Sequence, residues 1–221
     1  MQAAEDSPAP DHPLVAVHNA PPTDPARARR GPPSWLPNAI SFGRIALIPA
    51  FLGFAEACGT AAEAGLPESG ERALAAATLV AIGLSDVLDG YLARRWGLGT
   101  PLGAFLDALA DKLAQVSFVA YFTLRESAAF EQIPLWFLLL LVARDLVLAT
   151  GSLLVRRRRG AVDVEHKVHG KLVSLVQFAL LLAITLGLGS RGILVGVIAV
   201  AALTVPSTLG YVRHGIRQWR R

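Results

Sequence analysis

Four aspartates and one arginine stand at fixed spacing within strongly apolar sequence. They are Asp86, Asp89, Asp107, Asp111 and Arg94. An unpaired Asp at the centre of a membrane helix opposes insertion by roughly 2.5 to 3.5 kcal/mol, so four of them would oppose it by about 10 kcal/mol or more. Bound divalent cations, with Arg94 nearby, would compensate for this cost.

The spacing sorts the aspartates into two pairs. On a helix, Asp86 and Asp89 at i,i+3 share one face, and Asp107 and Asp111 at i,i+4 share a face of the next helix. Carboxylate oxygens suit Mg²⁺ or Mn²⁺, whereas the clustered Cys and His that would suit zinc are missing from this segment. The sequence therefore predicts a site for divalent cations between two helices.

Small residues accompany the carboxylates. Gly90, Ala93 and Gly103 remove side-chain bulk beside them, which would let a ligand or a neighbouring backbone approach closely. Arg94 offers a planar, bidentate phosphate donor. These residue types predict that the ligand is phosphorylated.

The complete pattern resembles the signature of the CDP-alcohol phosphatidyltransferase family, and the resemblance extends over roughly residues 36–190. It implies that the segment bridges the second and third transmembrane helices, binds two divalent metals and the CDP part of a CDP-linked lipid, and uses its last Asp as the base. The matched positions are Asp86, Asp89, Gly90, Ala93, Arg94, Gly103, Asp107 and Asp111.

Two stretches resemble particular branches of that family. The stretch 36–49, with Asn38 and Arg44, and the ending Asp111-Lys112 are similar to the glycerophosphate-acceptor and cardiolipin-forming branches, although Ala108 stands where those branches commonly carry Pro. The resemblance implies transfer of a phosphatidyl group from CDP-diacylglycerol to sn-glycerol 3-phosphate, giving phosphatidylglycerophosphate and CMP. Cardiolipin synthesis with phosphatidylglycerol as acceptor is the alternative.

A small dianionic acceptor requires several convergent cationic donors. Arg44 either snorkels to the membrane interface or faces the bundle interior and contacts the site. Ser174 and Gln177 follow Lys171 along one helical face, where they could line an acceptor pocket. The candidate acceptor-binding residues are Arg44, Lys112, Arg144, Lys167 and Lys171.

The elements that position these residues follow from composition. A hydrophobic content of 53% and a mean hydropathy of +0.46 exceed those of an ordinary soluble domain of 221 residues. We therefore predict an all-α integral membrane protein with a transmembrane domain over 35–221. Its six predicted spans lie near 39–57, 73–93, 101–124, 133–155, 169–189 and 192–212.

Charge distribution predicts the orientation. Residues 1–34 are rich in Pro, Ala and Asp and read as a disordered cytoplasmic tail. Lys and Arg gather before the first span, between spans two and three and four and five, and after the sixth. The positive-inside rule then places both termini and the site on the cytoplasmic side of the inner membrane. The pI near 9.7 reflects these anchors, so we expect contact with the lipid bilayer and not with nucleic acid.

Two other classes compete with the enzyme. A membrane cation or proton carrier could use intramembrane aspartates with Arg144 as a gate, but transport does not explain the spacing of the small residues and Arg94. A lipid-binding scaffold is disfavoured because all four acidic positions are retained. The resemblance also implies a possible homodimer.

Overall fold

The computed structural model describes residues 36–96, 101–159 and 168–220, and every regular element within those ranges is a helix. The predicted tail and Lys167 lie outside the described residues. The backbone of Ala93, Arg94 and Lys171 is described, but their side chains are not. The predicted all-α fold is confirmed.

Each predicted span corresponds to one helix. In chain order the helices are α2 (Leu36–Glu63), α3 (Ser69–Trp96), α4 (Pro101–Leu124), α5 (Leu135–Arg159), α6 (Val168–Thr185) and α7 (Ser190–Arg220).

Glycines end two of these helices. Gly65 after α2 and Gly187 after α6 have φ angles of 67° and 77°, a backbone conformation that glycine adopts without steric cost. In both turns the amides return to carbonyls of the last helical turn: Leu66 N donates to Ala61 O and Leu188 N to Ala183 O. Gly187 is the reason why α6 ends before the predicted boundary at 189.

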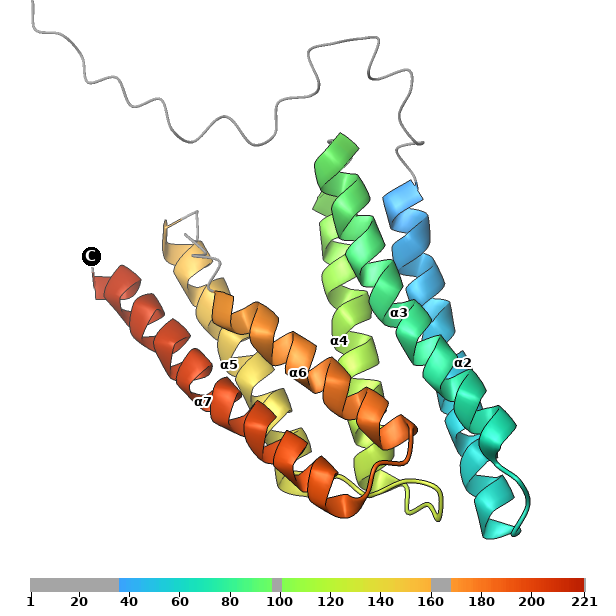
Figure 1. Ribbon diagram of the computed structural model, residues 1–221. Coiled ribbons are helices and arrows are strands. Elements are labelled where there is room, and N and C mark those ends of the chain that lie inside the picture. Colours follow the sequence, from blue (N-terminus) through green and yellow to red (C-terminus); the bar gives the residue numbers. More distant parts are fainter. Residues whose placement is uncertain (1–35, 97–100, 160–167, 221) are drawn as a thin grey trace, which may run out of the picture.

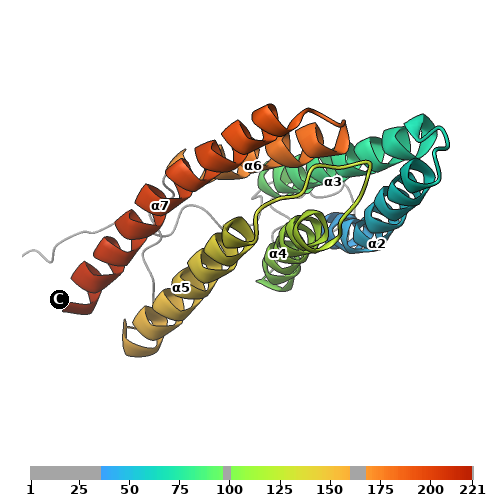
Figure 2. The ribbon, with the colours of Figure 1, turned by 90° about the horizontal axis from the view of Figure 1, so that it is seen from below.

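The helices form two groups that diverge toward one end. Figures 1 and 2 show α2, α3 and α4 packed together, with α5, α6 and α7 as a second group. Contacts of α3 with α6 and of α4 with α5 join the groups. The start of α2, the end of α3, the start of α4, the end of α5, the start of α6 and the C-terminus of α7 all lie at the upper, divergent end in Figure 1.

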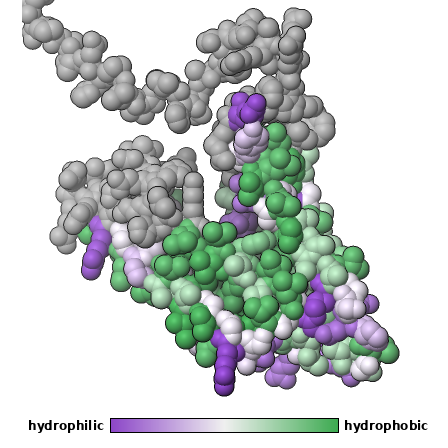
Figure 3. All heavy atoms as spheres, in the orientation of Figure 1, coloured by the Kyte–Doolittle hydropathy of each residue, from purple (hydrophilic) through white to green (hydrophobic). Residues whose placement is uncertain are grey.

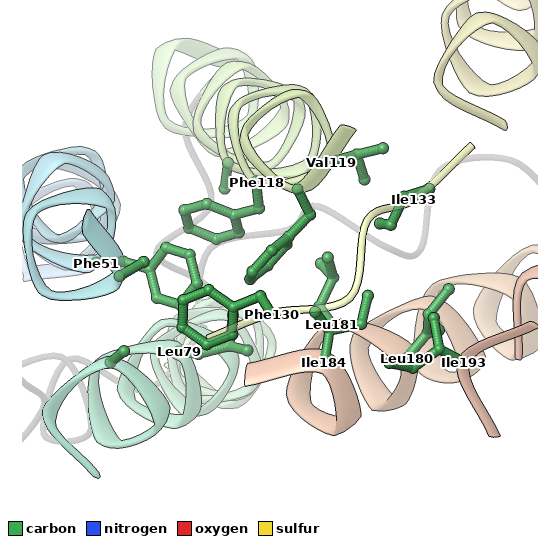
Figure 4. Close-up of a cluster of buried hydrophobic side chains, with 14 of the residues drawn as sticks. Phe51, Leu79, Phe118, Val119, Phe130, Ile133, Leu180, Leu181, Ile184 and Ile193 are labelled. Atoms are coloured by element: carbon green, nitrogen blue, oxygen red, sulfur yellow. The ribbon is translucent and has the colours of Figure 1, made fainter. Parts of the chain in front are cut away.

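An aromatic core holds the groups together away from that end. Phe51 of α2 packs on Phe118 of α4 with ring centroids 4.4 Å apart, and Phe122 lies 5.4 Å from Phe130 in the segment after α4. Figure 4 shows Phe51, Phe118 and Phe130 gathered with Leu79 of α3 and with Leu181 and Ile184 of α6. The junction between the groups is therefore a packed apolar layer.

Arg72 links segments at the end of the bundle opposite the divergent end. Its guanidinium, on α3, donates to the carbonyl of Thr185 at the end of α6 (3.1 Å) and to that of Ala129 (2.9 Å). The guanidinium carbon also lies 5.1 Å from the centroid of the Phe130 ring. One side chain thus satisfies carbonyls from two segments and links α3 to both of them.

The outer surface is that of a multi-pass membrane protein. Within the described part of the chain, four helices are long and apolar enough to cross a membrane: α2, α3, α5 and α7. The other two helices differ from these four. Helix α4 carries charged residues, among them Asp107 and Asp111, and the apolar stretch of α6 is short, Leu172–Thr185. Figure 3 shows apolar side chains over most of the visible face, with hydrophilic ones near the helix ends.

Candidate active site

Arg44 lies among three aspartates toward the divergent end of the bundle. Its Nη1 is 3.0 Å from Asp86 Oδ1 and 2.8 Å from Asp107 Oδ1, and its Nη2 is 2.6 Å from Asp89 Oδ2. Its Nε donates to Ser85 Oγ at 3.4 Å. Arg44 is only 2% exposed, so its predicted interior orientation is confirmed and the snorkelling alternative is wrong.

Three neighbouring helices supply these groups. Asp86 and Asp89 lie one turn apart on α3, as their i,i+3 spacing predicts, and Asp107 lies in the second turn of α4. Arg44 comes from α2, which contacts both α3 and α4. Acidic residues of two consecutive helices therefore meet around an arginine of a third helix that packs against both.

The three carboxylates fit a metal ion. One oxygen each from Asp86, Asp89 and Asp107 lies within 4.8 Å of the others. The side chain of Asp89 is 6% exposed, whereas those of Asp86 and Asp107 are 53% and 44% exposed. One carboxylate of the cluster is therefore buried, and solvent or a ligand can reach the other two. With Arg44 the three ionised carboxylates carry a net formal charge of −2, which one divalent cation would balance. Hard oxygen donors of this kind suit Mg²⁺, Mn²⁺ or Ca²⁺.

Asp111 lies beside this triad and lines an adjoining cavity of about 720 Å³. It follows Asp107 by one turn of α4, but its oxygens are not among the three that converge. Arg44, Asp86 and Gly90 also line the cavity, which places a carboxylate, the guanidinium and the backbone of a small residue around one space. A ligand in this cavity could contact Asp111 and the triad together.

The rest of the cavity wall comes from α3, α4 and α6. Ser174 and Gln177 of α6 line it, as their predicted shared face requires. The two helices approach closely here: a Cβ on Gly83 of α3 would stand 2.7 Å from a ring carbon of Phe178 on α6. Glycine at this position is what allows the ring to pack against α3 at the cavity edge.

A second charged network joins α4 to α5. Lys112 Nζ lies 2.9 Å from each carboxylate oxygen of Asp145 and donates to Gln115 Oε1 at 3.2 Å. Arg144 Nη1 is 3.7 Å from Asp145 Oδ1, and Arg144 Nε is buried with no hydrogen-bond partner among the described residues. Lys112 and Arg144, two predicted acceptor ligands, therefore share one carboxylate.

Residues 34–207 match the family described as CDP-alcohol phosphatidyltransferase, which covers most of the chain. The chain belongs to this family.

Relatives of this phosphatidyltransferase include enzymes of two kinds. It is 33% identical over 157 residues to the CDP-diacylglycerol--glycerol-3-phosphate 3-phosphatidyltransferase of Bacillus subtilis, covering 68% of this chain and 76% of that protein. It is 30% identical to a probable phosphatidylglycerophosphate synthase of Mycobacterium tuberculosis, covering 82% of each. It is 38% identical over 122 residues to a cardiolipin synthase (CMP-forming) of Streptomyces coelicolor, which is 55% of this chain but only 52% of that protein.

Sequence reasoning recovered most of this phosphatidyltransferase's acidic site. The structure brings together three of the four predicted metal ligands and places Asp111 and Gly90 on the adjoining cavity, while Gly103 lies half-buried on α4. It adds Ser85, for which no spacing signal existed, and Gln115. Gln115 follows Asp111 by four residues on a helix, so the i,i+4 rule could have found it.

Proposed function

We propose that this enzyme transfers the phosphatidyl group of CDP-diacylglycerol to sn-glycerol 3-phosphate, forming phosphatidylglycerophosphate and releasing CMP. The observation that carries the proposal is the convergence of Asp86, Asp89 and Asp107 beside a cavity lined by Asp111, in a chain of the CDP-alcohol phosphatidyltransferase family. The relatives from Bacillus and Mycobacterium, which align over most of their length, support glycerol 3-phosphate as the acceptor.

The four aspartates would have two roles. Asp86, Asp89 and Asp107 would hold a divalent ion, and Asp111 would contribute to a second one, as the family signature implies. Bound Mg²⁺ or Mn²⁺ would stabilise negative charge on the pyrophosphate and on the departing CMP. Arg94 clamps the donor phosphates, and Gly90, Ala93 and Gly103 leave room for the CDP part.

Asp111 is the base. The acceptor hydroxyl oxygen forms a bond to the phosphatidyl phosphorus, the bond from that phosphorus to the CMP oxygen breaks, and the hydroxyl proton passes to the Asp111 carboxylate. The carboxylate can accept the proton as the hydroxyl becomes acidic in the transition state. Its place on the cavity, one turn from Asp107, supports this role.

The acceptor phosphate binds to cations around the site. Lys112 and Arg144, linked through Asp145, lie on α4 and α5, and Lys171 and Lys167 lie at and before the start of α6. Arg44 contacts three carboxylates, so its contribution to the acceptor would be to hold the acidic groups that face it.

The enzyme works in the inner membrane with its site facing the cytoplasm. The basic segments predicted to be cytoplasmic adjoin helix ends that gather at one end of the bundle in Figure 1, which supports this orientation. CDP-diacylglycerol reaches the site from the bilayer, and water-soluble glycerol 3-phosphate reaches it from the cytoplasm. We also propose that the chain forms a homodimer, as the family resemblance implies.

Cardiolipin synthesis is the second candidate, favoured by the similarity to the Streptomyces enzyme. Purified protein in mixed micelles with CDP-diacylglycerol and Mg²⁺ should be offered glycerol 3-phosphate, phosphatidylglycerol and other alcohols separately, and the lipid product identified by mass spectrometry. We expect phosphatidylglycerophosphate. Cardiolipin alone would overturn the acceptor, and absence of CMP release with every acceptor would favour a carrier.

A further inference from the structure

Gln115 lines the cavity, and the nitrogen of its amide is buried beside it. Its Nε2 is buried and has no hydrogen-bond partner among the residues that the structure describes, while its Oε1 accepts from Lys112 Nζ at 3.2 Å. The ammonium cannot accept a hydrogen bond, so this contact fixes which end of the amide faces Lys112 and leaves the N–H group for another partner. A buried N–H without a partner is costly, and a ligand oxygen would remove that cost.

The position of Gln115 along the cavity indicates the kind of oxygen. On α4 the cavity-lining residues run from Asp111 to Gln115 to Phe118, each about one turn further from the acidic triad. Beyond Gln115 the wall becomes apolar, with Leu79 of α3 and Leu181 of α6. The order is therefore charged groups, then an amide donor, then hydrocarbon.

The cavity also has an apolar rim. Leu84 and Val87 of α3 are 64% and 66% exposed, and Leu175 of α6 is 64% exposed; all three line the cavity. In a membrane protein such side chains face lipid. A lipid tail could therefore reach the cavity along apolar side chains of α3 and α6.

We propose that Gln115 donates its Nε2–H to an ester carbonyl of a diacylglycerol lipid in this cavity, and so selects ester-linked over ether-linked substrates. A glycerophospholipid has the same order as the wall: phosphate, ester carbonyl, acyl chain. The inference rests on the proposed function for the presence of such a lipid. CDP-diacylglycerol and phosphatidylglycerol both carry the ester, and the experiment separates them.

The test compares binding of ester-linked and dialkyl ether-linked CDP-lipids by calorimetry in micelles. One hydrogen bond should favour the ester by about 3-fold to 10-fold in the parent protein. Gln115→Leu and Gln115→Glu should both bring the ratio to about 1. The glutamate keeps an acceptor for Lys112 and removes the N–H donor, and its added charge would strengthen the contact with Lys112. A role exerted solely through Lys112 would therefore leave an ester preference in this variant and overturn the proposal.

Gln132→Leu is the matched control. Gln132 lies in the segment after α4 and does not line the cavity, and its Nε2 donates to the carbonyl of Thr123. Loss of the Gln132 amide should therefore leave the ester preference unchanged. The same binding measurements should be made with ester-linked and ether-linked phosphatidylglycerol. If an ester preference that depends on Gln115 is found for phosphatidylglycerol but not for the CDP-lipid, the carbonyl that Gln115 binds belongs to phosphatidylglycerol, and the proposal is supported.

Product analysis separates this inference from the function. Phosphatidylglycerophosphate formed by a parent protein with no ester preference in either series would overturn the role of Gln115 and leave the function standing. A preference lost in both Gln115 variants, with no phosphatidylglycerophosphate made, would overturn the acceptor and leave the role of Gln115 standing.

Discussion

Arg44→Met tests the electrostatic account of the site. The substitution keeps an unbranched side chain of moderate length but leaves three carboxylates without their guanidinium. Removing one partner of a buried ion pair costs about 3–5 kcal/mol, whereas exposed pairs contribute about 0.2–1 kcal/mol. Only the pair of Arg44 with Asp89, which is 6% exposed, is a buried ion pair, because Asp86 and Asp107 are about half exposed. We therefore expect a loss near the lower limit, about 3 kcal/mol.

The assay is thermal unfolding in detergent with EDTA or with Mg²⁺. For a chain of this size a loss of about 3 kcal/mol lowers Tm by roughly 6–12 °C. With saturating Mg²⁺ the deficit should shrink to less than half, because the bound ion supplies the missing positive charge. The control is Arg95→Met, which removes an exposed arginine whose Nη1 donates to Tyr91 Oη, and should change stability by less than about 0.5 kcal/mol. An Arg44→Met protein as stable as the parent in EDTA, or a deficit that Mg²⁺ does not alter, would refute this reasoning.

Four further predictions follow from the site and the bundle. Asp111→Asn should lower the rate of CMP release 100-fold to 10,000-fold while CDP-diacylglycerol binding persists, and a folded variant with parental turnover would remove the proposed base. Excess chelator should stop CMP release and Mg²⁺ or Mn²⁺ should restore it, whereas Ca²⁺, with its looser geometry, should not; full activity in chelator would exclude the metal mechanism. Lys171→Ala and Arg144→Ala should raise KM for glycerol 3-phosphate at least several-fold with little change for CDP-diacylglycerol, and equal KM values in steady-state assays would remove both from the acceptor site. Arg72→Leu should lower the unfolding free energy by about 2–3 kcal/mol with or without Mg²⁺, because two carbonyls lose a charged donor; an unchanged Tm would contradict its fastening role.

The helices and the acidic triad were predictable because both depend on local spacing. Long apolar stretches specify helices, and the spacing of Asp86 and Asp89 puts two carboxylates on one face. Asp107 joins them because α4 follows α3 closely in the chain and both helices pack against α2. A motif carried by two consecutive helices therefore yields its geometry with few assumptions about the rest of the fold.

The partners of these residues were not predictable in the same way. Arg44 reaches Asp89 across 45 positions and Asp107 across 63, so no helical spacing rule links them. Arg144 and Asp145 are neighbours in the chain, but adjacent helical residues point in different directions. Asp145 consequently lies nearer to Lys112, 33 positions away, than to its neighbour. Such pairings depend on which helices pack together.

Isotope transfer tests the central claim most directly. Glycerol 3-phosphate labelled with ¹⁸O in the C1 hydroxyl should be incubated with the parent protein, Mg²⁺ and CDP-diacylglycerol, and both products analysed by mass spectrometry. We predict phosphatidylglycerophosphate and CMP in equal amounts, with the label in the lipid product and none in CMP, and no CMP without an acceptor. Unlabelled lipid product, labelled CMP, or CMP released equally well without glycerol 3-phosphate would contradict direct transfer of the phosphatidyl group to this acceptor.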